Sequence, residues 1–184
     1  GTLRVAACVY IEDDSGRKGF VSGYCSSLAQ STVSAAKWPR GLGTLDLLLM
    51  ESTYGDRTHR SLDESRAELV AFVRETVEEK RGSVILASFA MGRAQEILSL
   101  LLAARQSGEL ASSVPLHVDG MIKQINPIYR KHASFAVSNA AFNEVSGVAE
   151  REEIIFEAQN KPAIIVTTSA MMPGGPVVEY SRQL

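Results

Sequence analysis

Residues 51–59 gather side chains that could do acid–base or ligand-binding chemistry. They include the carboxylates Glu51 and Asp56, the cation Arg57 and the imidazole of His59. They directly follow residues 45–50, an apolar run that predicts a buried strand. Functional side chains in α/β proteins are usually placed where strands end, which favours a site here. A hydrogen-bonded turn after a strand uses the same residue types, and spacing alone leaves both interpretations open.

Helices and strands that would position such a site alternate from residue 61 onward. Ser61 and Glu64 form a capping-box pattern at the start of a helix, whose apolar positions recur at helical spacing over residues 69–77. Further helices are predicted over 92–107, 121–131, 150–159 and from Pro176 onward, with strands over 83–87, 114–118 and 162–168. Residues 133–150 give no clear pattern.

This alternation predicts an α/β fold with a mainly parallel sheet flanked by helices. The first 55 residues differ, because residues 3–11 and 19–22 predict two strands around the polar turn 13–16. We therefore expect a β-rich N-terminal piece over residues 1–55 and an α/β domain over residues 56–184.

Composition excludes several classes of protein. The chain has 184 residues, 45% of them hydrophobic and 22% charged, with a net charge of −2, which is typical of a folded globular chain and not of a disordered one. No apolar run approaches the roughly 20 residues of a membrane helix. The sequence also has no dominant basic block of the kind that binds polyanions over a whole protein surface. Cys8 and Cys25 fall in no zinc or redox spacing. We expect a cytoplasmic protein with no membrane partner.

Four blocks of the sequence resemble, in order and spacing, the β-CASP family of metallo-β-lactamase-fold ribonucleases. This family includes the mRNA 3′-end processing endonuclease of the cleavage and polyadenylation machinery, its archaeal relatives and RNase J. The blocks are residues 51–59 (Glu-Ser-Thr-Tyr-Gly-Asp-Arg-x-His), 87–96 (with Gly-Arg-Ala-Gln-Glu), 118–121 (Val-Asp-Gly-Met) and 164–180 (with Thr-Ser-Ala-Met and Gly-Gly-Pro). Residues 20–30 resemble the end of the metallo-β-lactamase sheet in archaeal members. The resemblance implies a β-CASP domain with a strip of that sheet.

The resemblance also implies roles for particular residues. Glu51 matches the family's acidic motif, where it would orient metal ligands or the attacking water without binding metal. Gly92 and Arg93 would bind RNA phosphate at a helix N-terminus, or Gly92 simply starts the helix and Arg93 pairs with Glu96. Ser169, Gly174 and Gly175 would form a second anion-binding turn, for which a tight structural turn is the competing interpretation.

The metal ligands of the family are missing from the pattern. Family members hydrolyse RNA with two zinc ions, held by a His-x-His-x-Asp-His run and further histidines, and the sequence contains no His-x-His. Tyr24 stands where the bridging aspartate is expected. We interpret His59 as a loop hydrogen-bonding residue, His117 as a satisfied core or interface histidine and His132 as a helix-end residue. The chain alone is therefore predicted to bind no cofactor and to be inactive, although zinc is expected in a complete active member.

The resulting prediction is the RNA-specificity region of a zinc-dependent 3′-end processing nuclease, which shapes the cleft for single-stranded RNA. Other RNA-processing subunits or a second copy are possible partners. The chain is either part of an active nuclease or a degenerate relative, and the sequence leaves this open. The alternative function is a non-catalytic scaffold subunit of an RNA-processing complex. A Rossmann-like nucleotide-binding module ranks lower, because no Gly-x-Gly-x-x-Gly loop follows a strand.

Overall fold

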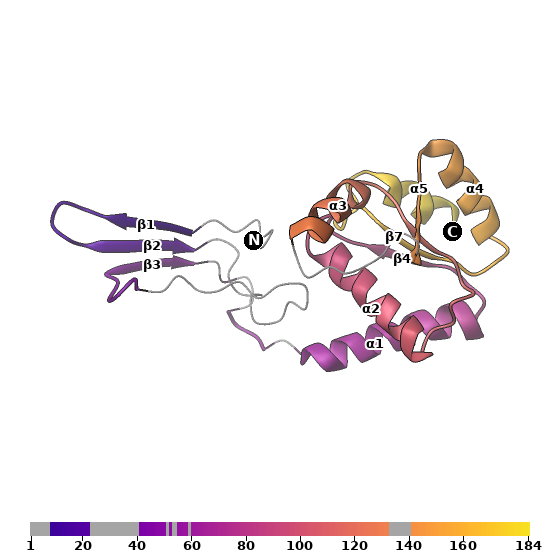
Figure 1. Ribbon diagram of the computed structural model, residues 1–184, viewed down its shortest axis with the longest axis horizontal. Helices are drawn as coiled ribbons and strands as arrows, with labels where there is room; N and C mark the ends of the chain where they lie inside the picture. Colours follow the sequence, from indigo (N-terminus) through magenta and orange to yellow (C-terminus); the bar gives the residue numbers. More distant parts are fainter. Residues whose placement is uncertain (1–7, 23–40, 51, 53–54, 59, 133–140) are drawn as a thin grey trace.

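The computed structural model describes residues 8–22, 41–50, 52, 55–58, 60–132 and 141–184. It contains a three-stranded sheet near the N-terminus and a separate four-stranded sheet with helices on both faces (Figure 1). Glu51, Tyr24 and His59 lie outside the described residues. The predictions made for these three residues therefore stay predictions.

The N-terminal sheet has the order β1-β2-β3. Strands β1 (Cys8–Glu12) and β2 (Lys18–Ser22) form the predicted hairpin, and β3 (Leu47–Met50) pairs with β2 in parallel. The Asp13 carboxylate fixes the hairpin turn by accepting hydrogen bonds from the backbone N–H groups of Ser15 at 2.9 Å and Arg17 at 3.0 Å. A short side-chain acceptor of this kind is the usual way to close such a turn.

Strand β3 is not buried, which corrects the prediction for residues 45–50. Its four side chains are all exposed, with 51% to 58% of their surface accessible. The apolar run predicted the strand correctly but not its burial. No helix or second sheet among the described residues packs on this strand, so its apolar side chains remain open to solvent.

The second sheet is parallel and has the order β4-β7-β5-β6. Its strands are β4 (Val84–Ala87), β5 (Leu116–Val118), β6 (Asn143–Glu144) and β7 (Ile164–Thr167). The helices are α1 (Leu62–Arg74), α2 (Arg93–Ser107), α3 (Ile122–His132), α4 (Val148–Ala158) and α5 (Pro176–Gln183), and a π-helical turn, Glu75–Glu79, extends α1. The α/β fold with a mainly parallel sheet is thus confirmed.

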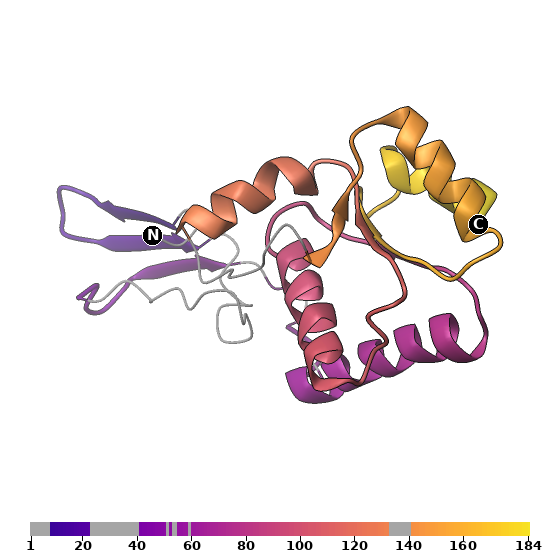
Figure 2. The same cartoon turned by 45° about the vertical axis from the view of Figure 1, so that its right-hand side comes forward.

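Helices cover both faces of this sheet and make a three-layer sandwich (Figures 1 and 2). The larger core lies between the sheet and α1, α2 and α3, where Leu98, Leu116 and Ile164 are fully buried. The smaller core lies on the opposite face, where Ile165 packs with residues of α4 and α5. Sequence neighbours on a strand point to opposite faces, so Ile164 and Ile165 of β7 serve the two cores in turn.

Local sequence signals fix several element ends. Ser61 and Glu64 make the predicted capping box, with the Glu64 backbone N–H donating to Ser61 Oγ at 3.2 Å. Pro176 occupies the first turn of α5, where its missing N–H costs nothing. Pro127 lies inside α3 without ending it. None of the helices in the described part of the chain is long and apolar enough to cross a membrane.

Candidate functional site at the carboxyl edge of the sheet

Three loops meet where β4, β7 and β5 end. Residues 88–92 follow β4, residues 119–121 follow β5 and residues 168–175 follow β7. The three strands are parallel neighbours in the sheet, so their carboxyl ends share one edge. This edge is where α/β proteins place their ligands.

The loops line one open cavity of about 430 Å³. Its lining residues come from all three loops: Ser88, Phe89, Ala90, Met121, Thr168, Ser169, Ala170, Pro173, Gly174 and Gly175. A cavity of this size is within the range that holds small molecules or parts of a polymer. The predicted phosphate-binding residues Ser169, Gly174 and Gly175 therefore lie together in the wall of one cavity.

Thr168 ties the loops to each other. Its hydroxyl accepts a hydrogen bond from the Met121 backbone N–H at 3.3 Å, and its carbonyl accepts one from Val177 at 3.0 Å. Gly120 has φ +77°, and a Cβ atom there would lie 2.0 Å from Thr168 Oγ1. Gly175 has φ +84°, and a Cβ atom there would lie 2.9 Å from the Thr168 carbonyl oxygen. Both positions require glycine, because the backbones approach closely in a left-handed conformation.

The buried side chain of Asp119 anchors the loop that follows β5. Only 1% of its surface is exposed. Its carboxylate accepts hydrogen bonds from Arg151 Nε of α4 at 2.7 Å and from the Tyr180 hydroxyl of α5 at 3.1 Å. Arg151 also donates to Glu179 Oε2 at 2.8 Å. Charged hydrogen bonds of this kind are stronger than neutral ones, so this cluster fixes β5, α4 and α5 relative to one another.

Electrostatics in the cluster favour the charged form of Arg151 and the neutral form of Tyr180. The hydrogen bond to Asp119 raises the pKa of Arg151, with a smaller contribution from Glu179. Burial raises the pKa of the Tyr180 hydroxyl, and the neighbouring Asp119 charge raises it further. Tyr180 therefore stays protonated and acts as a hydrogen-bond donor at neutral pH.

The start of α2 is held by its own side chains. Gly92 has φ +82° and donates its backbone N–H to Gln95 Oε1 at 2.7 Å. Gln95 Nε2 donates to the Ala90 carbonyl at 3.0 Å and to Asn126 Oδ1 at 2.9 Å. Arg93 Nη1 forms an ion pair with Glu96 Oε2 at 2.6 Å, as in the structural alternative, while its side chain stays half exposed. The other N–H donors of the Arg93 guanidinium take no part in this ion pair.

The structure thus places the predicted residues in two groups. Ser169, Gly174 and Gly175 line the cavity, whereas Gly92 and Arg93 begin α2 directly after the loop that lines it. Sequence reasoning did not single out Ser88 or Asp119. Their position in the sequence could have indicated a functional role, since each is the first polar residue after an apolar strand.

No cluster in the described part of the chain fits zinc. Three or more His, Cys, Asp or Glu side chains come together nowhere among these residues, whereas zinc takes at least three such ligands. Asp119, the best-placed carboxylate, is already bound by Arg151 and Tyr180.

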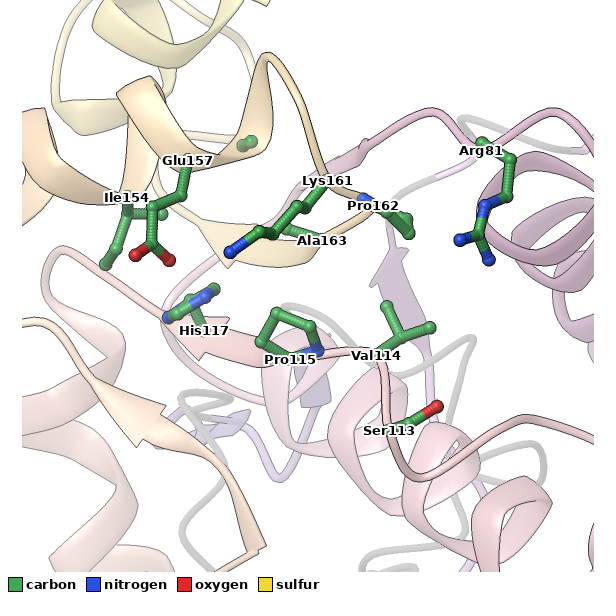
Figure 3. Close-up of a pocket in the computed structure, with 11 residues that line it drawn as sticks. Arg81, Ser113, Val114, Pro115, His117, Ile154, Glu157, Lys161, Pro162 and Ala163 are labelled. Atoms are coloured by element: carbon green, nitrogen blue, oxygen red, sulfur yellow. The ribbon is translucent and has the colours of Figure 1, made fainter.

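A second cavity, of about 270 Å³, lies at the opposite edge of the same sheet (Figure 3). His117 of β5, Glu157 and Lys161 line one part of it and Arg81 another. His117 is buried as predicted, but its Nδ1 atom has no hydrogen-bond partner. The expectation of a satisfied core histidine is therefore wrong at this atom, since neither Glu157 nor Lys161 in the same lining forms a hydrogen bond with it.

These features define an α/β domain with a loop-built cavity at the strand ends, and comparison with known proteins gives its family. The Beta-Casp domain model matches residues 94–184. The chain is 32% identical over 168 residues to transcription termination factor FttA of Thermococcus kodakarensis, covering 82% of this chain and 24% of that protein. It is 31% identical over 196 aligned positions to the RNase J-like protein of Methanocaldococcus jannaschii, covering 100% of this chain and 44% of that protein.

The chain belongs to the β-CASP family, as its sequence motifs predicted. This is a family of RNA-processing nucleases that generally depend on metal. The chain spans 24% of the FttA relative and 44% of the RNase J-like relative, so it corresponds to less than half of either protein.

Proposed function

We propose that this chain forms the RNA-binding region of a zinc-dependent RNA-processing nuclease. The observation that carries this proposal is the convergence of three family motifs on one cavity at the carboxyl edge of the sheet. Two helices, α2 and α5, begin beside that cavity. The positive end of the helix dipole attracts anions at a helix N-terminus, and the anions of RNA are its phosphates.

Arg93 and the Gly174–Gly175 turn are the proposed phosphate contacts. Arg93 is exposed and uses one of its donors for Glu96, so other guanidinium donors can bind phosphate oxygens. Gly174 and Gly175 carry no side chain, which allows a phosphate to approach their backbone closely. Ser169 adds a hydroxyl in the same cavity wall.

The cleavage chemistry is proposed for the complete protein and not for the described residues. There the zinc ions would be held by residues outside those described, with Glu51 orienting ligands or water. The name of the FttA relatives supports a nascent transcript as the RNA, and that of the RNase J-like relative supports a ribonuclease. Processing at the 3′ end and a cytoplasmic location belong to the same proposal.

Titration with single-stranded RNA at several salt concentrations tests the phosphate contacts. Each neutralised phosphate contributes a slope of about −0.7 to log K against log salt, so two or three contacts predict a slope of about −1.4 to −2.1. We expect Arg93→Ala to weaken RNA binding about 5-fold at low salt, since an exposed charge-assisted contact contributes about 1 kcal/mol. The magnitude of the salt slope should also fall by about 0.7, the contribution of one phosphate contact.

Arg66→Ala is the matched control for this titration. Arg66 also pairs with a carboxylate three residues away near a helix start, at 3.3 Å from Asp63 in α1. We expect this variant to bind RNA as the unchanged chain does. Equal losses in both variants would contradict a specific role for Arg93, and no salt-sensitive binding at all would contradict the proposed function.

A non-catalytic scaffold is the second candidate function. The exposed apolar strand β3 favours it, because large exposed apolar patches mark protein contacts. Another RNA-processing subunit or a second copy of the chain would then cover this sheet. RNA affinity that no loop variant changes, together with capture of such a subunit that Leu48→Glu abolishes, would support the scaffold over the RNA-binding region.

A further inference from the structure

The cavity at the carboxyl edge is mainly apolar, which phosphate binding does not explain. Phe89, Ala90, Met121, Ala170 and Pro173 contribute apolar side chains to its lining. Phe89 and Met121 are large side chains left in solvent, with 54% and 58% of their surface accessible. An RNA phosphate gains nothing from such a wall, whereas the flat face of a nucleobase stacks on aromatic side chains.

One polar atom in this lining lacks a partner. Ser88 is 2% exposed, and its Oγ atom makes no hydrogen bond. Leaving a buried hydroxyl unsatisfied costs about 1–3 kcal/mol. A ligand that reaches this hydroxyl recovers part of that cost, and nucleobases carry donors and acceptors on their edges while their faces are apolar.

The loop that carries Ser88 and Phe89 is held rigidly. The Ser88 backbone N–H donates to the Thr167 carbonyl at 2.9 Å, and the Phe89 carbonyl accepts from Ala94 at 3.2 Å. Gln95 holds the following residue, Ala90, through its side-chain amide at 3.0 Å. The Phe89 ring is therefore carried on a fixed backbone, which lowers the entropy lost when a base stacks on it.

We propose that this cavity binds one nucleobase of the single-stranded RNA, with Phe89 against the base face and Ser88 Oγ bonded to the base edge. The inference rests on the proposed RNA binding and adds a specificity-determining pocket to it. A base in the cavity lies between the loop that leads to Arg93 and the Gly174–Gly175 turn, both of which reach its rim. The phosphates on either side of that base then meet the proposed phosphate contacts.

Two strands of equal length and charge separate base binding from phosphate binding. One is an oligouridylate of about eight nucleotides, within the usual site size, and the other carries abasic sugar–phosphate units throughout. The chain is expected to bind the oligouridylate at least about 5-fold more tightly, since base stacking contributes about 1–3 kcal/mol. Phe89→Ala should remove that difference without weakening the abasic strand, and Phe89→Tyr should keep it.

Phe72→Ala is the matched control, because Phe72 of α1 is also an aromatic residue with 54% of its surface exposed. It should leave both affinities unchanged. Equal binding of the two strands by the unchanged chain, or equal weakening of both by Phe89→Ala, overturns the base pocket while RNA binding stands. Binding of neither strand overturns the RNA-binding function and the pocket together. A dimer that forms through the cavity and that RNA does not displace also overturns the pocket.

Ser88→Ala tests the hydrogen bond to the base edge. We expect this variant to reduce the ratio between the tightest and weakest affinities for the four RNA homopolymers by about 3-fold or more. The melting temperature of the variant should stay equal or rise, because an unsatisfied buried hydroxyl is removed. Ser112→Ala, an exposed serine, is the control. An unchanged spread of affinities, or a lowered melting temperature with no change in base preference, overturns the role of Ser88.

Discussion

His117 of β5 lines the second cavity, where its side chain is largely buried and its Nδ1 atom has no hydrogen-bond partner. Burial lowers the pKa of its imidazole below the ordinary value of 6.5, and this outweighs the opposing charges of Glu150 and Glu157. The ring is therefore neutral in the folded chain at a pH where the unfolded chain already binds a proton.

This burial predicts a stability that depends on pH. Because the folded pKa is lowered, the unfolded chain binds more protons as the pH falls through about 6.5, so the free energy of unfolding decreases below that value and is fully retained above it. Urea unfolding between about pH 5.5 and 7.5 measures this slope. His117→Phe, which keeps a ring of similar size, should flatten it. A slope that is the same in both proteins would show that other groups cause the dependence.

Residue roles were only partly predictable from the sequence. The pattern gave two interpretations of Arg93, and the structure shows the pair with Glu96 while leaving phosphate binding as a prediction. Asp119 was not recognised because its burial depends on Arg151 and Tyr180, which are distant in sequence. Ser88 was not recognised because a serine after a strand looks the same whether or not its hydroxyl has a partner.

At the scale of elements, the Asp119–Arg151 pair connects β5 to α4 and, through Tyr180, to α5. The Arg151 side chain is only 10% exposed. Arg151→Met keeps the aliphatic stem but removes the guanidinium that donates to the buried Asp119 carboxylate, whose remaining ion pair is the longer 3.8 Å contact with Lys123 Nζ. We expect a loss of about 3–5 kcal/mol in the free energy of unfolding, the usual result of breaking one side of a buried pair.

Urea unfolding measures this loss, and Arg182→Met provides the control on the exposed surface of α5. Exposed substitutions of this kind change stability by less than about 0.5 kcal/mol. A loss below about 1 kcal/mol in Arg151→Met would contradict the anchoring role of the pair.

Most helices and strands were predictable because the spacing of apolar residues agrees with the capping and turn residues at the element ends. The helices around residues 69–77 and 94–102 show the apolar spacing of a half-buried face, and each begins or ends at a capping residue. Strand β6 could not be predicted, since two residues carry no period. The π-helical turn after α1 and the order β4-β7-β5-β6 depend on tertiary packing, which local patterns do not contain.

For the whole molecule, the sequence predicted the family and the α/β architecture but not the environment of its first sheet. Residues 45–50 were expected to be buried because their composition matches a strand covered on both sides. The structure gives two separate sheets, while the proposed division at residue 55 stays a prediction. A local pattern reports how apolar a strand is and not which other elements cover it.

Metal content is also a property of the whole molecule. The sequence lacks a His-x-His run, and the described residues gather no set of three ligands. We expect the purified chain, after dialysis, to contain well below one zinc per molecule by elemental analysis, and zinc chelation to leave its melting temperature unchanged. Two tightly held zinc ions per chain would contradict this prediction.

The open strand β3 also affects how such measurements must be made. No strand among the described residues pairs with its outer edge, and its sequence of three leucines and a methionine has no charge to discourage pairing with another chain. Protein concentration then becomes an experimental variable, since edge-to-edge association would mimic cooperative RNA binding. A charged substitution such as Leu48→Lys protects this edge while leaving the distant loops of the second sheet untouched.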